Sequence, residues 1–186
     1  IGLGLIESIK LDDILAYEDP DDLDGDGISG KANRLYDSKE NRVLIGRFGW
    51  KASQSSLLSQ TFDATYNDMG LSSTYTSKMN NCTEIQIECQ QLINGNSETH
   101  DGVEVSNEQL DLMVFYQRHL SPPGRRNINN PNVLAGKKIF FNSGCNSCHV
   151  QKYTTKKTAK SLALSDQLIW PYSDFLLHDM GDELGD

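Results

Sequence analysis

Basic residues are scarce in this sequence. Its 186 residues include 17 Lys and Arg against 26 Asp and Glu, which gives a formal net charge of −9 at pH 7. A protein that binds nucleic acid needs clustered Lys and Arg to neutralise the phosphate groups. The composition therefore argues against that class of partner, and we expect no nucleic acid to bind.

Long apolar runs are absent as well. A helix that spans a bilayer needs roughly 18 or more consecutive apolar residues, and no stretch of the sequence approaches that length. We therefore expect no membrane span. Hydrophobic residues make up 37% of the chain and charged residues 23%, which is the composition of a globular protein with a small core. The length suits one ordinary domain or two small ones.

Cysteine is limited to two local pairs, Cys82 with Cys89 and Cys145 with Cys148. His149 follows Cys148 directly, so the second pair has the spacing of a covalent haem c attachment site. Each thiol can add to one vinyl group along the same edge of the porphyrin, and the imidazole of the next residue can bind the iron. The sequence therefore predicts one haem c, held by two thioethers and by an axial histidine.

Two other uses of these cysteines stay open. Cys145 and Cys148 alone could form a thioredoxin-like thiol pair, although the flanking sequence lacks the expected βαβ pattern. All four cysteines could instead hold a structural zinc ion. If haem takes the second pair, a disulfide between Cys82 and Cys89 is the simplest use of the first. A disulfide and haem c both indicate an oxidising compartment, so we expect a periplasmic or extracellular protein.

Alternating acidic residues precede a glycine in the N-terminal part of the chain. Asp22, Asp24 and Asp26 resemble the first half of an EF-hand loop, in which carboxylates converge on Ca²⁺. Ile28 would offer its backbone carbonyl to the same ion. The twelfth position of such a loop would be Asn33 rather than a bidentate Glu, so a solvated acidic turn is the alternative interpretation.

Apolar periodicity and capping residues predict a mainly α chain with long loops. A capping box starts one helix at Ser106, and the prolines from Pro122 onward end it. The pair Asn130-Pro131 starts another helix, as cap and first helical residue. This second helix runs into the haem attachment motif.

Weaker signals concern the first third of the chain. Residues 2–18 predict one or two short helices, the second of them capped by Asp12. Composition favours a further helix at residues 56–65. On the same grounds Phe48 and Trp50 are expected in the core.

A sixth ligand for the iron is expected beyond His149. Met180 is the leading candidate, because a thioether ligand favours ferrous iron. His178 is the competing candidate, either on the iron or in a hydrogen bond to a haem propionate. Plain core packing is the alternative for Met180.

Several short stretches have a more specific character. Residues 136–140 leading into 145–149 look like the opening of a cytochrome c domain. Residues 1–7, 24–30, 46–52, 68–70, 171–174 and 177–181 are more particular. Together they resemble the di-haem oxidoreductase family, whose members are often labelled thiol oxidoreductases and are distant relatives of bacterial di-haem cytochrome c peroxidases and of MauG. The resemblance covers nearly the whole chain.

The resemblance implies a cytochrome c-like fold. Family members carry two haem c groups in two cytochrome c domains, and this sequence has one attachment motif. The other motif would lie upstream of Ile1, so that the sequence is a fragment. Residues 1–121 would be the later part of the first cytochrome c-like domain. Residues 122–186 would be the start of the second, truncated one.

The resemblance also implies two catalytic residues. Peroxide cleavage needs a carboxylate beside an open haem iron, to move a proton between the two oxygens. Asp68 stands where the peroxidase-type relatives have a Glu, and it is shorter by one methylene. Trp50 or Phe48 would lie between the haems as an electron bridge. A surface turn for Asp68 and core packing for Trp50 are the alternatives.

The sequence is therefore interpreted as part of a periplasmic di-haem c-type oxidoreductase that transfers electrons through haem, with peroxide reduction as its candidate reaction. Its partners would be an electron-donor or acceptor protein and a small oxidant such as peroxide. The alternatives are an electron-carrier cytochrome without substrate chemistry, and a thiol–disulfide oxidoreductase.

Haem attachment predicts both a spectrum and a mass. A chain matured with the attachment machinery should show the narrow haem c band when it is reduced in alkaline pyridine. Its intact mass should exceed that of the polypeptide by one haem. A plain apoprotein mass would contradict the prediction.

Overall fold

The computed structural model describes residues 2–37, 41–76, 78, 80–157 and 161–184. The predicted domain ranges and the first matching stretch also include Ile1, residues 158–160 and residues 185–186, which lie outside the described part of the chain.

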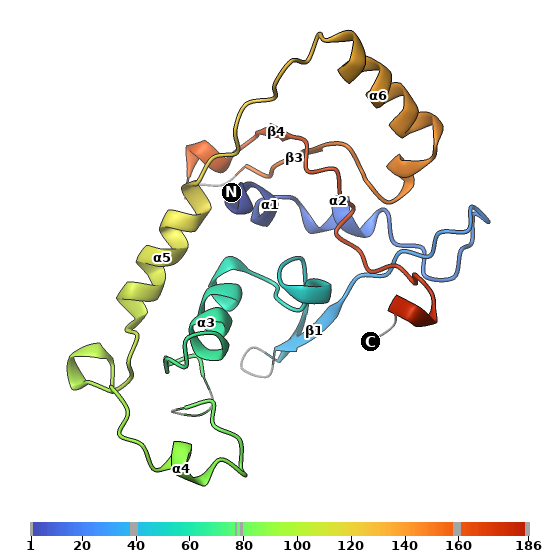
Figure 1. The fold of residues 1–186 in the computed structure, drawn as a ribbon. Coiled ribbons are helices and arrows are strands. Elements are labelled where there is room, and N and C mark those ends of the chain that lie inside the picture. Colours follow the sequence, from blue (N-terminus) through green and yellow to red (C-terminus); the bar gives the residue numbers. More distant parts are fainter. Residues whose placement is uncertain (1, 38–40, 77, 79, 158–160, 185–186) are drawn as a thin grey trace.

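The described residues form a mainly helical chain, as predicted (Figure 1). Two short antiparallel hairpins accompany the helices: β1 (Arg34–Asp37) pairs with β2 (Arg42–Ile45), and β3 (Tyr153–Thr154) pairs with β4 (Leu168–Ile169). Brief 3₁₀ turns include η1 (Trp50–Ala52), η3 (Cys145–Ser147) and η5 (Asp182–Leu184). The α-helices are α1 (Leu3–Glu7), α2 (Leu11–Leu15), α3 (Leu57–Asn67), α4 (Ile87–Gln90), α5 (Asn107–His119) and α6 (Pro131–Asn142).

Helices α5 and α6 begin at their predicted caps, Ser106 and Asn130. Ser106 Oγ accepts from the backbone N–H of Gln109 at 3.2 Å, and the Gln109 side chain accepts from Ser106 N at 2.9 Å, which completes the capping box. Asn130 caps α6 by accepting from Asn132 N at 2.9 Å. The predicted cap at Asp12 is wrong, because α2 begins one residue earlier and Asp12 lies inside its first turn. There the carboxylate still favours the helix dipole.

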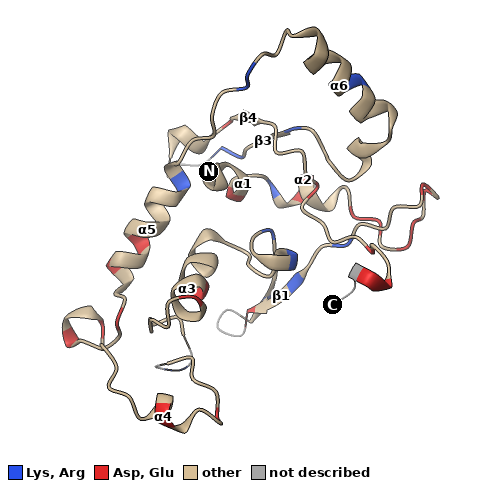
Figure 2. Ribbon diagram, viewed as in Figure 1, with Lys and Arg blue, Asp and Glu red and all other residues tan. Residues whose placement is uncertain are grey.

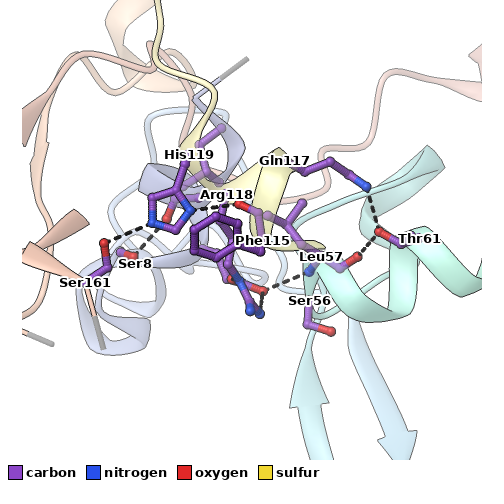
Figure 3. A network of polar contacts seen from close by, with 12 residues as sticks. Ser8, Ser56, Leu57, Thr61, Phe115, Gln117, Arg118, His119 and Ser161 are labelled. Atoms are coloured by element: carbon purple, nitrogen blue, oxygen red, sulfur yellow. Dashed lines mark hydrogen bonds and ion pairs between the residues drawn. The ribbon is translucent and has the colours of Figure 1, made fainter. Parts of the chain in front are cut away.

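Helices α1, α3 and α5 pack around a small apolar core of Phe48, Leu57 and Val114. The close crossing of α1 and α5 depends on Gly4, where an added Cβ would lie 2.2 Å from the Arg118 carbonyl oxygen. Figure 3 shows how polar contacts surround this core, with Gln117 of α5 donating to Thr61 of α3 at 3.0 Å.

Glu7 links all three helices. Its Oε1 accepts from the backbone N–H of Leu57, the first residue of α3, at 2.8 Å. Its Oε2 accepts from Arg118 Nε at 2.6 Å. The N–H of Leu57 is one of the donors that a helix start leaves unpaired, and a carboxylate there also meets the positive end of the helix dipole. One side chain of α1 therefore fixes both α3 and α5.

A second core joins the two ends of the chain. Ile9 and Ile14 pack with Val150 and Tyr153 in one buried cluster. The backbone of Ser8 accepts from Lys156 N at 2.8 Å. In Figure 1, α1 and α2 accordingly run beside β3 and β4. The predicted first and second parts of the chain therefore share a core.

Phe48 and Trp50 have opposite environments. Phe48 is buried, as predicted, but Trp50 is 77% exposed, so the prediction of a core Trp50 is wrong. Phe48 and Gln54 exchange two backbone hydrogen bonds of 2.9 Å, which closes a tight turn and leaves the residues at its tip in solvent. Lys51 and Ala52 have positive φ angles in this turn, a conformation that non-glycine residues rarely adopt.

The surface carries its acidic residues unevenly. Figure 2 shows Asp and Glu on α2, on the loop that follows it and near the C-terminus, on one side of the molecule. At another edge of the molecule, Cys82 and Cys89 are joined in a disulfide. Across the described ranges, no helix has both the length and the apolar character to cross a bilayer.

Leu57 offers a direct test of the first core. Its side chain is 0% exposed at the start of α3, so Leu57→Ala should lower the free energy of unfolding by about 2–5 kcal/mol through lost burial and a cavity. Leu92 is 73% exposed, and Leu92→Ala should change it by less than about 0.5 kcal/mol. Urea unfolding measures both, and equal losses would contradict this core.

Candidate functional site

The haem attachment motif follows directly on α6. Ser143 caps the helix, and Gly144 then takes a left-handed conformation with φ 75°, which an L side chain rarely adopts. The chain turns through η3, where His149 N donates to the carbonyl of Cys145 at 3.0 Å. Cys145 is exposed and Cys148 is partly buried, and both carry free thiols. Both sulfurs are therefore available for thioether bonds.

A distant segment holds this motif in place. The backbone N–H of Asp174 donates to Cys148 O at 3.1 Å, and that of Ser173 donates to Val150 O at 3.1 Å. We call residues 171–178 the clamp segment, because it runs along the motif and lies against it from Cys148 to Val150. Its backbone contacts fix the motif independently of any cofactor.

The clamp segment also fixes the His149 ring. His149 Nδ1 lies 2.9 Å from the backbone oxygen of Tyr172. A carbonyl oxygen only accepts hydrogen bonds, so Nδ1 must carry the proton, and Nε2 keeps its lone pair. Metal-bound histidines are typically oriented by such a contact from the other ring nitrogen. The tautomer and its support therefore fit an iron ligand.

Apolar groups near the motif could cover a porphyrin. Phe140 of α6 has its ring centroid 6.2 Å from that of His149 and 5.5 Å from that of Tyr172. Along α6, large apolar side chains are exposed at Val133 and Ile139. A helix normally buries an apolar face against another element, and this one is free to contact a large apolar ligand. Together with the two thiols and His149, the site fits haem c.

Cys148 faces a hydrogen-bonded pair of side chains within the clamp segment. Its sulfur lies 4.0 Å from His178 Nδ1, and His178 Nε2 lies 2.7 Å from Asp174 Oδ2. Asp174 is only 4% exposed. Burial raises the pKa of the Cys148 thiol above its ordinary value, and the negative charge of Asp174 raises it further.

The two candidates for a sixth ligand differ in their surroundings. Both ring nitrogens of His178 already have neighbours, Nε2 the Asp174 carboxylate and Nδ1 the Cys148 sulfur. Met180 is 68% exposed, so the alternative of core packing is wrong for it. Among the described residues, no hydrogen bond or ring contact holds the Met180 side chain in place. Its role as an iron ligand stays a prediction.

Trp50 and Asp68 lie away from the attachment motif. Trp50 is at the tip of the turn after β2, and Asp68 is an exposed residue at the end of α3. Neither contacts Cys145, Cys148 or His149 through any hydrogen bond or ring contact among the described residues. Their catalytic roles therefore stay predictions that concern another part of the molecule.

A large cavity lies among α1, α3, α5 and the β1–β2 hairpin. Its volume is about 1180 Å³, somewhat above the roughly 300–1,000 Å³ of typical small-molecule and cofactor sites. The walls combine apolar and aromatic side chains with basic ones. Among the lining residues are Leu44, Leu58, Phe62, Phe115, Arg47 and Arg118.

The acidic loop gathers a different set of carboxylates from the predicted one. Oxygens of Asp22 and Asp24 lie within 4.8 Å of each other and of Asp19, a residue that the prediction left out. Asp26 instead accepts from the backbone N–H of Ile28 at 2.9 Å and is not part of this group. Calcium binding stays a prediction, with Asp19 rather than Asp26 beside the other two.

The sequence reasoning missed two residues that organise the attachment site. Tyr172 acts through its backbone carbonyl, which no side-chain pattern reveals. Asp174 is a buried carboxylate four residues before His178, and that spacing alone has many uses. The sequence signal that points to them is the resemblance of residues 171–174 to the family, which by itself assigns these residues no role.

The two thiols should differ in reactivity in the apoprotein. Cys145 is exposed, whereas Cys148 is partly buried and that burial raises its thiol pKa, so less of Cys148 is the reactive thiolate than of an ordinary thiol. Iodoacetamide should therefore label Cys145 faster, as measured by mass spectrometry of digests taken over time. In urea the two rates should converge, and faster labelling of Cys148 in the folded chain would contradict the raised pKa.

Comparison with known proteins gives one result that covers the whole chain. The sequence model of the family described as "Di-haem oxidoreductase, putative peroxidase" matches residues 1–186. No curated protein and no solved structure matches the chain. The attachment motif, its supported histidine and this match agree. The chain belongs to the di-haem oxidoreductase family.

Proposed function

We propose that this chain holds one haem c through Cys145, Cys148 and His149, and that it serves a peroxidase-like oxidoreductase in electron transfer. The observation that carries the proposal is the contact of His149 Nδ1 with the Tyr172 carbonyl at 2.9 Å. A cysteine pair for thiol exchange has no need of a histidine whose Nε2 is kept free. A zinc knot of four thiolates is disfavoured too, because Cys82 and Cys89 are already bonded to each other.

Haem supplies an iron that can accept and release one electron, and the chain's own residues determine how it is held. The two sulfurs fix one edge of the ring, and the η3 turn sets their separation. His149 presents Nε2, and the Tyr172 carbonyl makes that nitrogen a stronger donor. Phe140 and the exposed face of α6 supply apolar surface that excludes water from the ring.

The other haem of the family has a candidate site in the large cavity. Apolar walls such as Phe62 and Phe115 suit the face of a porphyrin, and Arg47 can pair with a carboxylate at its edge, whereas Arg118 is already paired with Glu7. Arg47 Nε is buried without a hydrogen-bond partner among the described residues, and a propionate would satisfy it. The proposal includes a second haem there, attached or held by a segment other than 145–149.

The reaction at that second haem would be peroxide reduction. Asp68 would act as the proton-transfer carboxylate and Trp50 as the electron bridge, as the family resemblance implies. The 77% exposure of Trp50 leaves its indole accessible for such a role.

The compartment and the electron partner follow from two surface features. The Cys82–Cys89 disulfide supports an oxidising location such as the periplasm. The acidic side of the molecule (Figure 2) supports a partner protein with a basic surface, because complementary charges speed encounter and fix orientation.

Single substitutions test the attachment site. After maturation, Cys145→Ala and Cys148→Ala should each carry haem through one thioether, and the reduced pyridine band of each should move to longer wavelength. The double variant should lose covalent haem altogether. His149→Ala should keep both thioethers and lose the axial nitrogen, which changes the absorption spectrum of the iron.

Cys82→Ala/Cys89→Ala is the matched control, since it also removes two cysteines. It should keep the full haem c mass. Covalent haem that survives in the Cys145→Ala/Cys148→Ala variant would contradict the proposal.

A further inference from the structure

The disulfide-closed loop around α4 exposes a large share of its apolar side chains. We call residues 82–93, which run from the first cysteine of the disulfide through α4 and the turn after it, the α4 loop. Ile85 is 90% exposed, Ile87 55%, Leu92 73% and Ile93 100%. Neither core cluster of the described residues includes any of them. Aliphatic side chains that gather on a surface in this way mark an interaction site.

The backbone of the α4 loop is fixed although its side chains lie in solvent. The disulfide closes the loop, and Gln90 Nε2 donates to Thr83 O at 2.6 Å within it. Just before the loop, Asn81 Nδ2 donates to Tyr66 O at 3.0 Å, near the end of α3. A surface that is already ordered loses little conformational freedom when a partner binds. The loop is therefore suited to docking without rearrangement.

The sequence around the α4 loop carries charge of one sign. No Lys or Arg occurs in residues 79–117, whereas seven Asp and Glu do. Figure 2 accordingly shows acidic segments and no basic one on α4 and on the chain from there to the start of α5. All but Glu104 are exposed, namely Glu84, Glu88, Glu98, Asp101, Glu108 and Asp111.

These carboxylates restrict what the α4 loop can dock. Nucleic acid and anionic lipid carry negative charge, and the same loop of a second copy would bring like charges face to face, which costs free energy. Stable protein interfaces have an apolar centre and a polar rim. A protein surface with apolar residues flanked by Lys or Arg therefore complements both the aliphatic side chains and the carboxylates.

We propose that the α4 loop is a docking surface for a partner protein that presents apolar residues flanked by Lys or Arg. The four exposed aliphatic side chains form the apolar part of the surface, and Glu84 and Glu88 supply its charge. The inference goes beyond the proposed function and does not depend on it. In Figure 1, α4 and α6 lie at opposite ends of the molecule.

The experiment uses a synthetic amphipathic helical peptide of leucine and lysine as the probe. One control peptide has glutamate in place of every lysine, and another has serine in place of every leucine. The matured full chain, labelled with ¹⁵N, is titrated with each peptide. Shifts of the backbone amide signals in NMR spectra locate the binding site, and calorimetry measures Kd.

The leucine–lysine peptide should bind and shift the amide signals of residues 84–93 most. Ile85→Ser/Leu92→Ser should raise its Kd by about tenfold or more, because burial of two aliphatic side chains is lost. The matched control is Ile128→Ser/Leu162→Ser, which changes side chains that are 52% and 89% exposed elsewhere and should leave Kd unchanged.

Charge and rigidity have their own variants. Glu84→Gln/Glu88→Gln should weaken binding of the leucine–lysine peptide, whereas Asp21→Asn/Asp166→Asn, at exposed carboxylates outside the α4 loop, should not. The Cys82→Ala/Cys89→Ala variant should also bind more weakly, because its loop must be ordered on binding. All of these side chains except Cys82 and Cys89 are exposed, so urea unfolding should match wild type for the other variants.

Several results would overturn the proposal. These are no saturable binding of the leucine–lysine peptide, equal binding of either control peptide, the largest shifts outside residues 84–93, or equal Kd values for the loop variant and its control. Dimerisation of the chain alone that Ile85→Ser/Leu92→Ser abolishes would make a second copy the occupant instead. Haem attachment is measured separately by the pyridine band, so failure of the proposed function is distinguishable.

Discussion

The attachment site depends on the pairing of two backbone segments that are distant in sequence. The clamp segment contacts the motif through Asp174 N, Ser173 N and the Tyr172 carbonyl. A pentapeptide of two cysteines and a histidine has no regular structure long enough to fix its own side chains. Backbone hydrogen bonds to a second segment supply that rigidity, and each is satisfied on both sides. Without them the thiols and the imidazole would have no common geometry.

The N-terminal part of the chain contributes to the same site indirectly. Ile9 and Ile14 fill the core beneath Val150 and Tyr153, and Lys31 exchanges backbone hydrogen bonds of 2.8 Å with Leu177 in the clamp segment. The Glu7 carboxylate then connects this region to α3 and α5. A disturbance in the predicted first domain would therefore reach the haem motif through packing.

Local signals in the sequence were sufficient for the long helices and for the motif. Ser106 and Asn130 placed α5 and α6 correctly, because a cap satisfies donors within a few residues of itself. Cys145, Cys148 and His149 are predicted as haem ligands for the same reason, since their spacing is a property of the pentapeptide, and that role stays a prediction. The family itself was identified from short stretches spread along the chain, and the match over residues 1–186 confirmed it.

Features that depend on tertiary contacts could not be predicted. The composition of the surrounding stretch predicts Trp50 in the core. The backbone pairing of Phe48 with Gln54 instead places Trp50 at the tip of a turn, exposed to solvent. The carboxylate of Asp19 lies beside those of Asp22 and Asp24 because the chain folds back. The alternation of acidic residues along the sequence predicts Asp26 in that place instead. The support that Tyr172 and Asp174 give to the motif cannot be predicted for a related reason. Both reach the motif across more than twenty residues of chain through backbone groups, the Tyr172 carbonyl and the Asp174 N–H.

The exposed apolar face of α6 has a consequence for the life of the protein in a cell. Among the described elements, α6 makes its main contact with η3, the turn that carries the first thiol. A chain without its cofactor would therefore present a loosely anchored, greasy helix to proteases. If the proposed haem is held at Cys145 and Cys148, its ring would cover part of that helix, and resistance of α6 to proteolysis would then follow from loading the cofactor.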